Sequence, residues 1–198
     1  VARAQGRFDQ AAEPPGNLIA GAGMARSLCR QGRVQEALAM ALPLRDRGVH
    51  VLKHEQLGVL LNAVAGCYSA QGDSAQAFAY MFEALRHAGP RSGRGFDTVL
   101  HCNLAHELLQ IGDYEHALMH VAQGLARGGA LKNARLQSVL WINRVICLTE
   151  LGRAAEAGPE GHALLAGPAD ASGRGRMAAH FETLAIAASG QGLRAHFR

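Results

Sequence analysis

Histidine and cysteine are the residue types in this sequence with the widest chemical capacity, and the chain has ten histidines and four cysteines. His116 and His120 are four residues apart, which would place both imidazoles on one face of a helix. His101 and His106 form a second pair close in sequence. A zinc site needs three or four converging ligands, and no acidic or cysteine motif completes either pair. We therefore expect surface histidines and no metal site.

The four cysteines, at positions 29, 67, 102 and 147, show neither CxxC pairing nor the density of a disulfide scaffold. Cys67 and Cys147 are eighty residues apart and each precedes an apolar residue. Free, reduced and partly buried thiols in a cytosolic protein are the simplest interpretation.

Motifs for catalysis or nucleotide binding are incomplete. Gly21-Ala22-Gly23 lies inside a helical pattern with no preceding strand, so the context for dinucleotide binding is missing. The Ser-Gly-Arg-Gly segments at 92–95 and 172–175 lack a following Lys-Ser/Thr, and neither GxSxG nor HExxH occurs. We expect no enzyme activity in this segment, no catalytic residues and no cofactor.

Charge and hydropathy narrow the class of partner. The formal net charge is only +4, and the basic residues are dispersed, with local groups in glycine-rich connections. We expect solvated loops here; nucleic-acid binding is the alternative, and it would weaken steeply with salt. No run approaches the roughly 18 apolar residues of a membrane span, and no leader opens the sequence. We therefore predict a cytoplasmic protein with no membrane contact and a protein or peptide partner.

A forty-residue period organises the elements that would position these side chains. Glycine recurs at positions 32, 72, 112, 152 and 192, and alanine follows the first four at the fifth position. Apolar residues spaced three and four apart predict a pair of helices around each glycine. The predicted helices span residues 17–30, 34–47, 53–70, 74–87, 96–110, 114–127, 133–150, 154–165 and 176–189.

Local signals set the ends of these helices. Each turn glycine has the position of a C-cap, and Asp73, Ser74 and Asp113 are suitable N-caps. Pro43 is expected to kink or shorten the helix that contains it. We predict a partial repeat over 1–16, four repeats over 17–172 and a partial fifth repeat over 173–198. The incomplete ends indicate a segment of a longer protein; the alternative is an intact chain that self-associates through its open ends.

The third repeat carries the family resemblance, in residues that combine large, small and aromatic types at fixed spacing: Leu104, Ala105, Leu108, Gly112, Tyr114, Ala117 and Gly124. This pattern resembles the tetratricopeptide repeat (TPR), in a long form of forty residues instead of the usual 34. The resemblance implies an all-α solenoid of stacked helix-turn-helix units coiled into a right-handed superhelix. The fourth repeat departs from the pattern at Arg144 and Gly161.

The resemblance also implies a concave groove lined by the first helix of each pair. The groove positions that we single out are Asn62, Cys102, Asn103, His106, Ile142, Asn143 and Ile146. Asn103 and Asn143 are forty residues apart, and an amide both donates to and accepts from a peptide backbone. The alternative is that these are solvated polar residues on half-exposed helices.

Long units of this kind resemble the N-terminal TPR regions of bacterial signalling proteins, such as GGDEF diguanylate cyclases and some LuxR- or MalT-like regulators. The resemblance implies an interaction or sensory region that binds a peptide or partner domain and controls an output domain beyond it. The alternative is a passive assembly scaffold without a signalling role.

Overall fold

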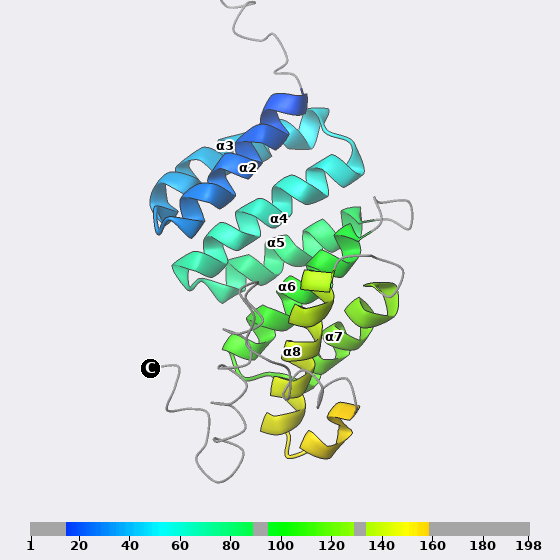
Figure 1. The fold of residues 1–198 in the computed structure, drawn as a ribbon. Helices are drawn as coiled ribbons and strands as arrows, with labels where there is room; N and C mark the ends of the chain where they lie inside the picture. Colours follow the sequence, from blue (N-terminus) through cyan, green and yellow to red (C-terminus); the bar gives the residue numbers. More distant parts are fainter. Residues whose placement is uncertain (1–14, 89–94, 129–133, 159–198) are drawn as a thin grey trace, which may run out of the picture. The chain divides into compact units, whose positions relative to one another are not determined.

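The computed structural model describes residues 15–88, 95–128 and 134–158 (Figure 1). Within these residues there are seven α-helices, one short 3-10 helix and no strand, which confirms the all-α prediction. The helices are α2 (Pro15–Arg30), α3 (Val34–Val51), α4 (His54–Gln71), α5 (Ser74–His87), α6 (Phe96–Gln110), α7 (Tyr114–Gly128), α8 (Ala134–Glu150) and η1 (Ala154–Ala157).

Four of the five periodic glycines lie in the described residues, and all four end a helix in the same way. Gly32, Gly72, Gly112 and Gly152 have φ between 70° and 83°, the left-handed region that side chains rarely adopt. The N–H after each glycine donates to a carbonyl five residues back, as Asp73 does to Tyr68 at 3.0 Å. This is a Schellman motif, and it confirms the predicted turns. The fifth, Gly192, lies outside the described residues.

Aspartates begin the helices that follow two of these turns. The carboxylate of Asp73 accepts a 3.0 Å hydrogen bond from the Gln76 N–H, and that of Asp113 accepts one of 3.3 Å from the His116 N–H. Each bond satisfies a backbone donor that the first helical turn leaves open. Asp73 and Asp113 are therefore confirmed as N-caps, whereas Ser74 is the first residue of α5.

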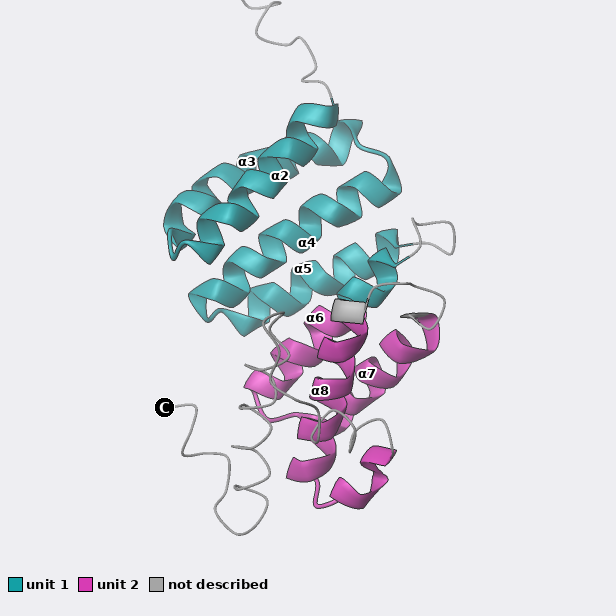
Figure 2. Cartoon of the chain, viewed as in Figure 1, with its two compact units in different colours: residues 1–100 teal, residues 101–198 magenta. Residues whose placement is uncertain are grey.

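The chain divides into two compact units, residues 1–100 and 101–198, with the boundary inside α6 (Figure 2). In the first unit α4 packs against α2, α3 and α5. Every residue from Leu60 to Ala65 in α4 is buried, so this helix is enclosed on all sides. Burial of a leucine side chain contributes about 1.5–3 kcal/mol, which makes Leu60 and Leu61 major contributors to this core.

Small residues bring the helices of the first unit close together. One cluster joins α2, α3 and α4 through Ala25, Ala37, Ala41, Val64 and Cys67. A second lies beside it around Leu18, Leu44 and Leu60, and a third joins α4 to α5 and α6 around Leu61, Ala84 and Leu100.

In the second unit, α7 packs against α8, and η1 packs on α8. Its fully buried side chains include Leu104, Val121, Leu140 and Leu148. Gly124 of α7 lies so close to Leu140 that an added Cβ would be 2.8 Å from the leucine Cδ2 atom. This glycine is therefore a packing residue that allows α7 and α8 to approach closely.

The expectation that Pro43 shortens its helix is wrong. Helix α3 continues through the proline to Val51, four residues beyond the predicted end at position 47. Pro43 lies on the exposed side of α3, and Ala39, whose carbonyl loses its helical donor, is exposed as well. Because water can satisfy that carbonyl, the helix tolerates the proline.

The predicted helix over 154–165 is described only at its start, where η1 forms a single 3-10 turn. The predicted helix over 176–189 and the partial repeats over 1–16 and 173–198 fall wholly or almost wholly outside the described residues. The stacking of all hairpins into one right-handed solenoid stays a prediction.

Candidate functional site

The predicted groove residues of α4 and α6 differ widely in exposure. Asn62 is only 7% exposed, and Cys102 is buried as well. Asn103 is half-buried, and His106, one helical turn further along α6, is exposed. Among the predicted groove positions of α6, the side chains that remain accessible are therefore the amide of Asn103 and the imidazole of His106.

The groove residues of α8 follow a similar pattern. Ile142 and Asn143 are buried, while Ile146 is half-buried. The two asparagines that are forty residues apart thus have different environments, because Asn103 keeps partial access to solvent and Asn143 is only 4% exposed.

The buried amide of Asn143 carries an open hydrogen-bond donor. Its Nδ2 atom is inaccessible and has no hydrogen-bond partner among the described residues. A buried polar group without a partner costs about 1–3 kcal/mol. An acceptor supplied from outside the described residues would remove that cost, and a peptide carbonyl is an acceptor of the required kind.

Arg144, the neighbour of Asn143, occupies a position at which the repeat pattern has an apolar residue. Its guanidinium carbon lies 5.8 Å from the centroid of the Trp141 ring, and its Nη2 donates to the Glu156 carbonyl at 3.4 Å. The tryptophan face and the carbonyl together replace the apolar packing that the pattern predicts. The departure at Arg144 is therefore accommodated within α8 and η1.

A buried histidine pair joins α6 to α7. The Nδ1 atoms of His101 and His120 are 3.0 Å apart, and the ring centroids are 5.2 Å apart. At that separation one Nδ1 must donate and the other accept, so the two atoms share one proton. His120 is 6% exposed, and burial, with a smaller contribution from His116, lowers its pKa. The expectation of a surface histidine at position 120 is wrong.

A second pair repeats this geometry between α4 and α5. The Nδ1 atoms of His54 and His87 are also 3.0 Å apart, with ring centroids again 5.2 Å apart. This pair is exposed. The pKa of His87 is lowered, first by partial desolvation and then by His54.

The histidines that were grouped by sequence spacing have other partners in the structure. His116 binds Asp113 within its own helical turn, with Nδ1 2.8 Å from Oδ2, while His120 turns to His101. In the part of the chain that the structure describes, no group of three or more histidine, cysteine or acidic side chains converges.

Two of the four cysteines meet across adjacent helices. The Sγ atoms of Cys29 in α2 and Cys67 in α4 are 2.9 Å apart, and both residues are free thiols. The other two cysteines, Cys102 and Cys147, are buried in the second unit. Their separation of 38 residues is close to the forty-residue period, so both thiols lie near the ends of α2 and α4, the first helices of consecutive hairpins. This spacing is the sequence signal that could have predicted the contact.

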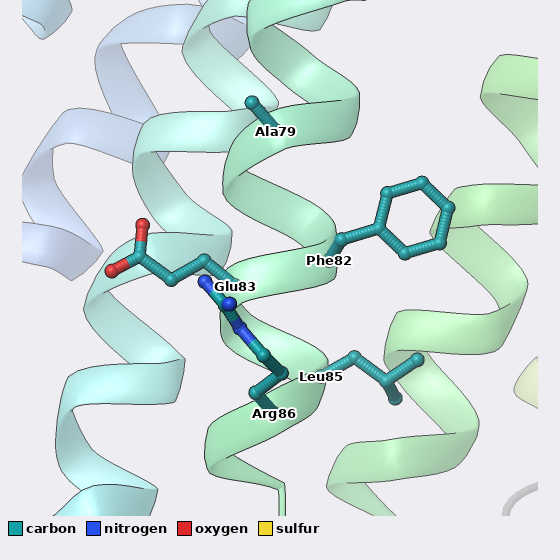
Figure 3. Close-up of a pocket in the computed structure, with 5 residues that line it drawn as sticks. All are labelled: Ala79, Phe82, Glu83, Leu85 and Arg86. Carbon is teal, nitrogen blue, oxygen red and sulfur yellow. The ribbon is translucent and has the colours of Figure 1, made fainter.

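The surface of α5 has one open hollow, with a volume of about 430 Å³. In Figure 3, Phe82 and Leu85 point to one side of the helix, and Glu83 points to the other. All five lining residues, Ala79, Phe82, Glu83, Leu85 and Arg86, belong to this single helix. A hollow formed by one helix face does not enclose a ligand, so we assign no binding site to it.

Comparison with protein-family models, with curated proteins and with solved structures finds no match to this chain. None of the described helices combines the length and the apolar character that a membrane crossing requires. The described residues therefore define a class of protein, all-helical and built from hairpins of consecutive helices.

Proposed function

We propose that this chain is a TPR-like interaction region of a larger bacterial regulatory protein, located in the cytoplasm. In this proposal the hairpins stack into a right-handed solenoid, and the concave side of the first helices binds a peptide or a partner domain. We assign no catalytic step, metal or cofactor to this segment.

The support for a repeat array is local and recurrent. Four identical Schellman turns occur at forty-residue intervals, and in the first unit each helix packs on its neighbour in sequence. Equal turns at equal spacing give successive hairpins the same internal geometry, which is the condition for stacking them.

The observation that carries the binding proposal is the Nδ2 donor of Asn143. This amide is buried, lies at a position predicted to line the groove, and has no acceptor among the described residues. An extended peptide supplies a backbone carbonyl at regular intervals and would complete this hydrogen bond once the Asn143 side chain turns its Nδ2 atom to the surface. Asn103, forty residues earlier and half-buried, would be the next contact along the peptide.

In the regulatory form of the proposal, ligand binding changes the state of an output domain outside this segment, such as a diguanylate cyclase. A ligand controls such a change only if it binds the two states of the protein with different affinity. A protein that binds its partner without this coupling would be a passive scaffold.

The test uses three purified variants as bait in the lysate of the source cell: wild type, Asn143→Ala, and Asn17→Ala as a matched control. Asn17 is an exposed asparagine at the start of α2. We expect one protein to be captured by wild type and by Asn17→Ala, and to be lost with Asn143→Ala. Equal capture by all three variants would contradict a groove site at Asn143.

A stability measurement separates binding from folding. If the Asn143 donor is open in the free protein, removal of the amide leaves the free energy of unfolding unchanged or raises it. Loss of capture together with a loss of about 1 kcal/mol or more would instead indicate that the amide holds the fold. A partner that is captured without any change in the output activity of the full-length protein would favour the passive scaffold.

A further inference from the structure

We propose that Cys29 and Cys67 form a redox modification site, in which a hydroperoxide converts the two thiols to an intramolecular disulfide that cross-links α2 to α4. The proposal is independent of the binding function above. It rests on the geometry of the two sulfurs, on their different access to solvent and on the lack of a third metal ligand among the described residues.

The distance between the sulfurs favours a covalent bond. The Sγ–Sγ separation of 2.9 Å is well inside the roughly 3.5–4.0 Å at which nonbonded heavy atoms normally pack. A disulfide has an S–S length of about 2.05 Å, so the sulfurs must approach by less than ~1 Å. The two sulfurs are therefore a short movement from bonding distance.

A shared metal ion fits the pair less well. Two thiolates on a tetrahedral zinc ion are about 3.8 Å apart, given Zn–S bonds of about 2.3 Å. The sulfurs would have to separate, and two further ligands would be needed. Among the described residues no third histidine, cysteine or acidic side chain completes such a site.

Both cysteines lie beside the Schellman turns that end their helices. Cys29 lies in the last turn of α2, where its carbonyl accepts the Gly32 N–H of the Schellman turn. Cys67 lies in the last turns of α4, next to Tyr68, whose carbonyl accepts the Asp73 N–H of the next Schellman turn. Both thiols belong to the same cluster of packed residues in the first unit.

The two thiols differ in access, which sets the order of the steps. Cys29 is half-buried, whereas Cys67 is fully buried. Burial, and then the neighbouring Cys29, raise the pKa of the Cys67 thiol to about 12, so Cys67 is not the thiol that attacks an oxidant. Cys29 is therefore the peroxidatic thiol and Cys67 the resolving thiol.

The reaction balances with one hydroperoxide. The Cys29 sulfur attacks one peroxide oxygen, the O–O bond breaks, and Cys29 sulfenic acid and one water are formed when the peroxide is hydrogen peroxide. The Cys67 sulfur then attacks the sulfenic sulfur, the S–O bond breaks, and the oxygen leaves as a second water. Two thiols are oxidised to one disulfide while the peroxide is reduced to two waters.

The test is a peptide map of the folded protein after reduction, removal of the reductant and treatment with hydrogen peroxide. Remaining thiols are alkylated in denaturant, and the protein is cleaved with trypsin, which releases Cys29 in residues 27–30 and Cys67 in residues 54–86. We expect these two peptides to be joined by a disulfide and to separate on reduction, while Cys102 and Cys147 are recovered alkylated.

Variants test the order of the steps. With a diketone trap for sulfenic acid, Cys67→Ser should label at Cys29 several-fold more strongly than wild type, and Cys29→Ser should not label at Cys67. The double variant Cys102→Ser/Cys147→Ser is the matched control and should form the 27–30 to 54–86 link as wild type does. Circular dichroism before and after oxidation establishes that the protein stays folded.

Two results would overturn the proposal. One is full alkylation of Cys29 and Cys67 after oxidation of the folded wild-type protein, a result that needs no variant. The other is random pairing among all four cysteines, which would indicate reaction of the unfolded chain.

Discussion

Two glycines of α4 provide a sharp test of the packing, because the same substitution should have opposite effects at each. Gly58 and Gly66 lie eight residues apart in the same helix. A Cβ atom added at Gly58 would be 2.9 Å from Phe96 Cε1 and 3.3 Å from the Ala84 carbonyl oxygen. A Cβ atom added at Gly66 would meet nothing within 4 Å.

The magnitudes follow from two opposing terms. Replacement of glycine by alanine inside a helix contributes about 1 kcal/mol of helix propensity at either position. At Gly58 the overpacking costs about 1–3 kcal/mol, because the carbonyl of Ala84 is backbone and cannot rotate away. We therefore expect Gly66→Ala to stabilise by about 0.5–1 kcal/mol and Gly58→Ala to destabilise by about 1 kcal/mol.

The assay is denaturant unfolding followed by circular dichroism, with both variants and wild type measured together. A difference of about 2 kcal/mol corresponds to roughly 4–8 °C in melting temperature for a chain of this size. If Gly58→Ala is stabilised as much as Gly66→Ala, the close approach of α4 to α5 and Phe96 is refuted. If Gly66→Ala is destabilised, the space around that residue is filled.

Four further results are expected. The Cys29–Cys67 disulfide closes a loop of 38 residues and should raise the free energy of unfolding by up to roughly 4 kcal/mol. Equal stability of the reduced and oxidised proteins in denaturant titrations would argue against the cross-link. The folded pKa of His120 is lowered, so the unfolded chain binds the proton more readily and stability should fall as pH drops through about 6.5. In His120→Asn this pH dependence should become shallower; an unchanged stability profile between pH 7 and 5 would exclude His120 as its source. Pro43→Ala should raise the free energy of unfolding by roughly 2 kcal/mol, because a gain of about 3 kcal/mol in helix propensity is reduced by about 1 kcal/mol for the greater entropy of the unfolded chain. A lower melting temperature than wild type would refute that account. Asp73→Ala removes the N-cap bond to Gln76 and should cost about 1 kcal/mol in thermal unfolding, whereas a neutral result would mean that water replaces the carboxylate.

The periodic features of the fold were predictable because they depend on neighbours in sequence. A glycine at C′ and an aspartate at the N-cap act through the backbone within six residues, so Gly72 and Asp73 could be assigned from their order alone. The predicted shortening at Pro43 was wrong because the effect of a proline on helix length depends on which face of the helix it occupies.

Side-chain pairing was less predictable, because it depends on how two helices meet. His120 was grouped with His116 from their spacing, although its Nδ1 atom contacts His101, nineteen residues away. Cys29 and Cys67 were likewise interpreted as separate thiols. The burial of Asn62 and Asn143 also follows from tertiary packing and has no signature in the repeat pattern.

The Schellman turns determine where the length of this chain can vary. The turn inside each hairpin is closed by the same two backbone hydrogen bonds, so an extra residue there would rotate the following helix by about 100° and displace its apolar face. The connections between hairpins are not alike: α3 is followed after only Leu52 and Lys53 by α4, whereas residues 88–95 separate α5 from α6.

Helix length compensates for this difference. The 18-residue α3 precedes the short connection, and the 14-residue α5 precedes the long one. A long helix before a short connection and a short helix before a long connection thus both leave forty residues between successive turn glycines. Insertions or engineered reporters are accordingly expected between hairpins, where added length leaves the turn glycine of each hairpin and its two backbone hydrogen bonds intact.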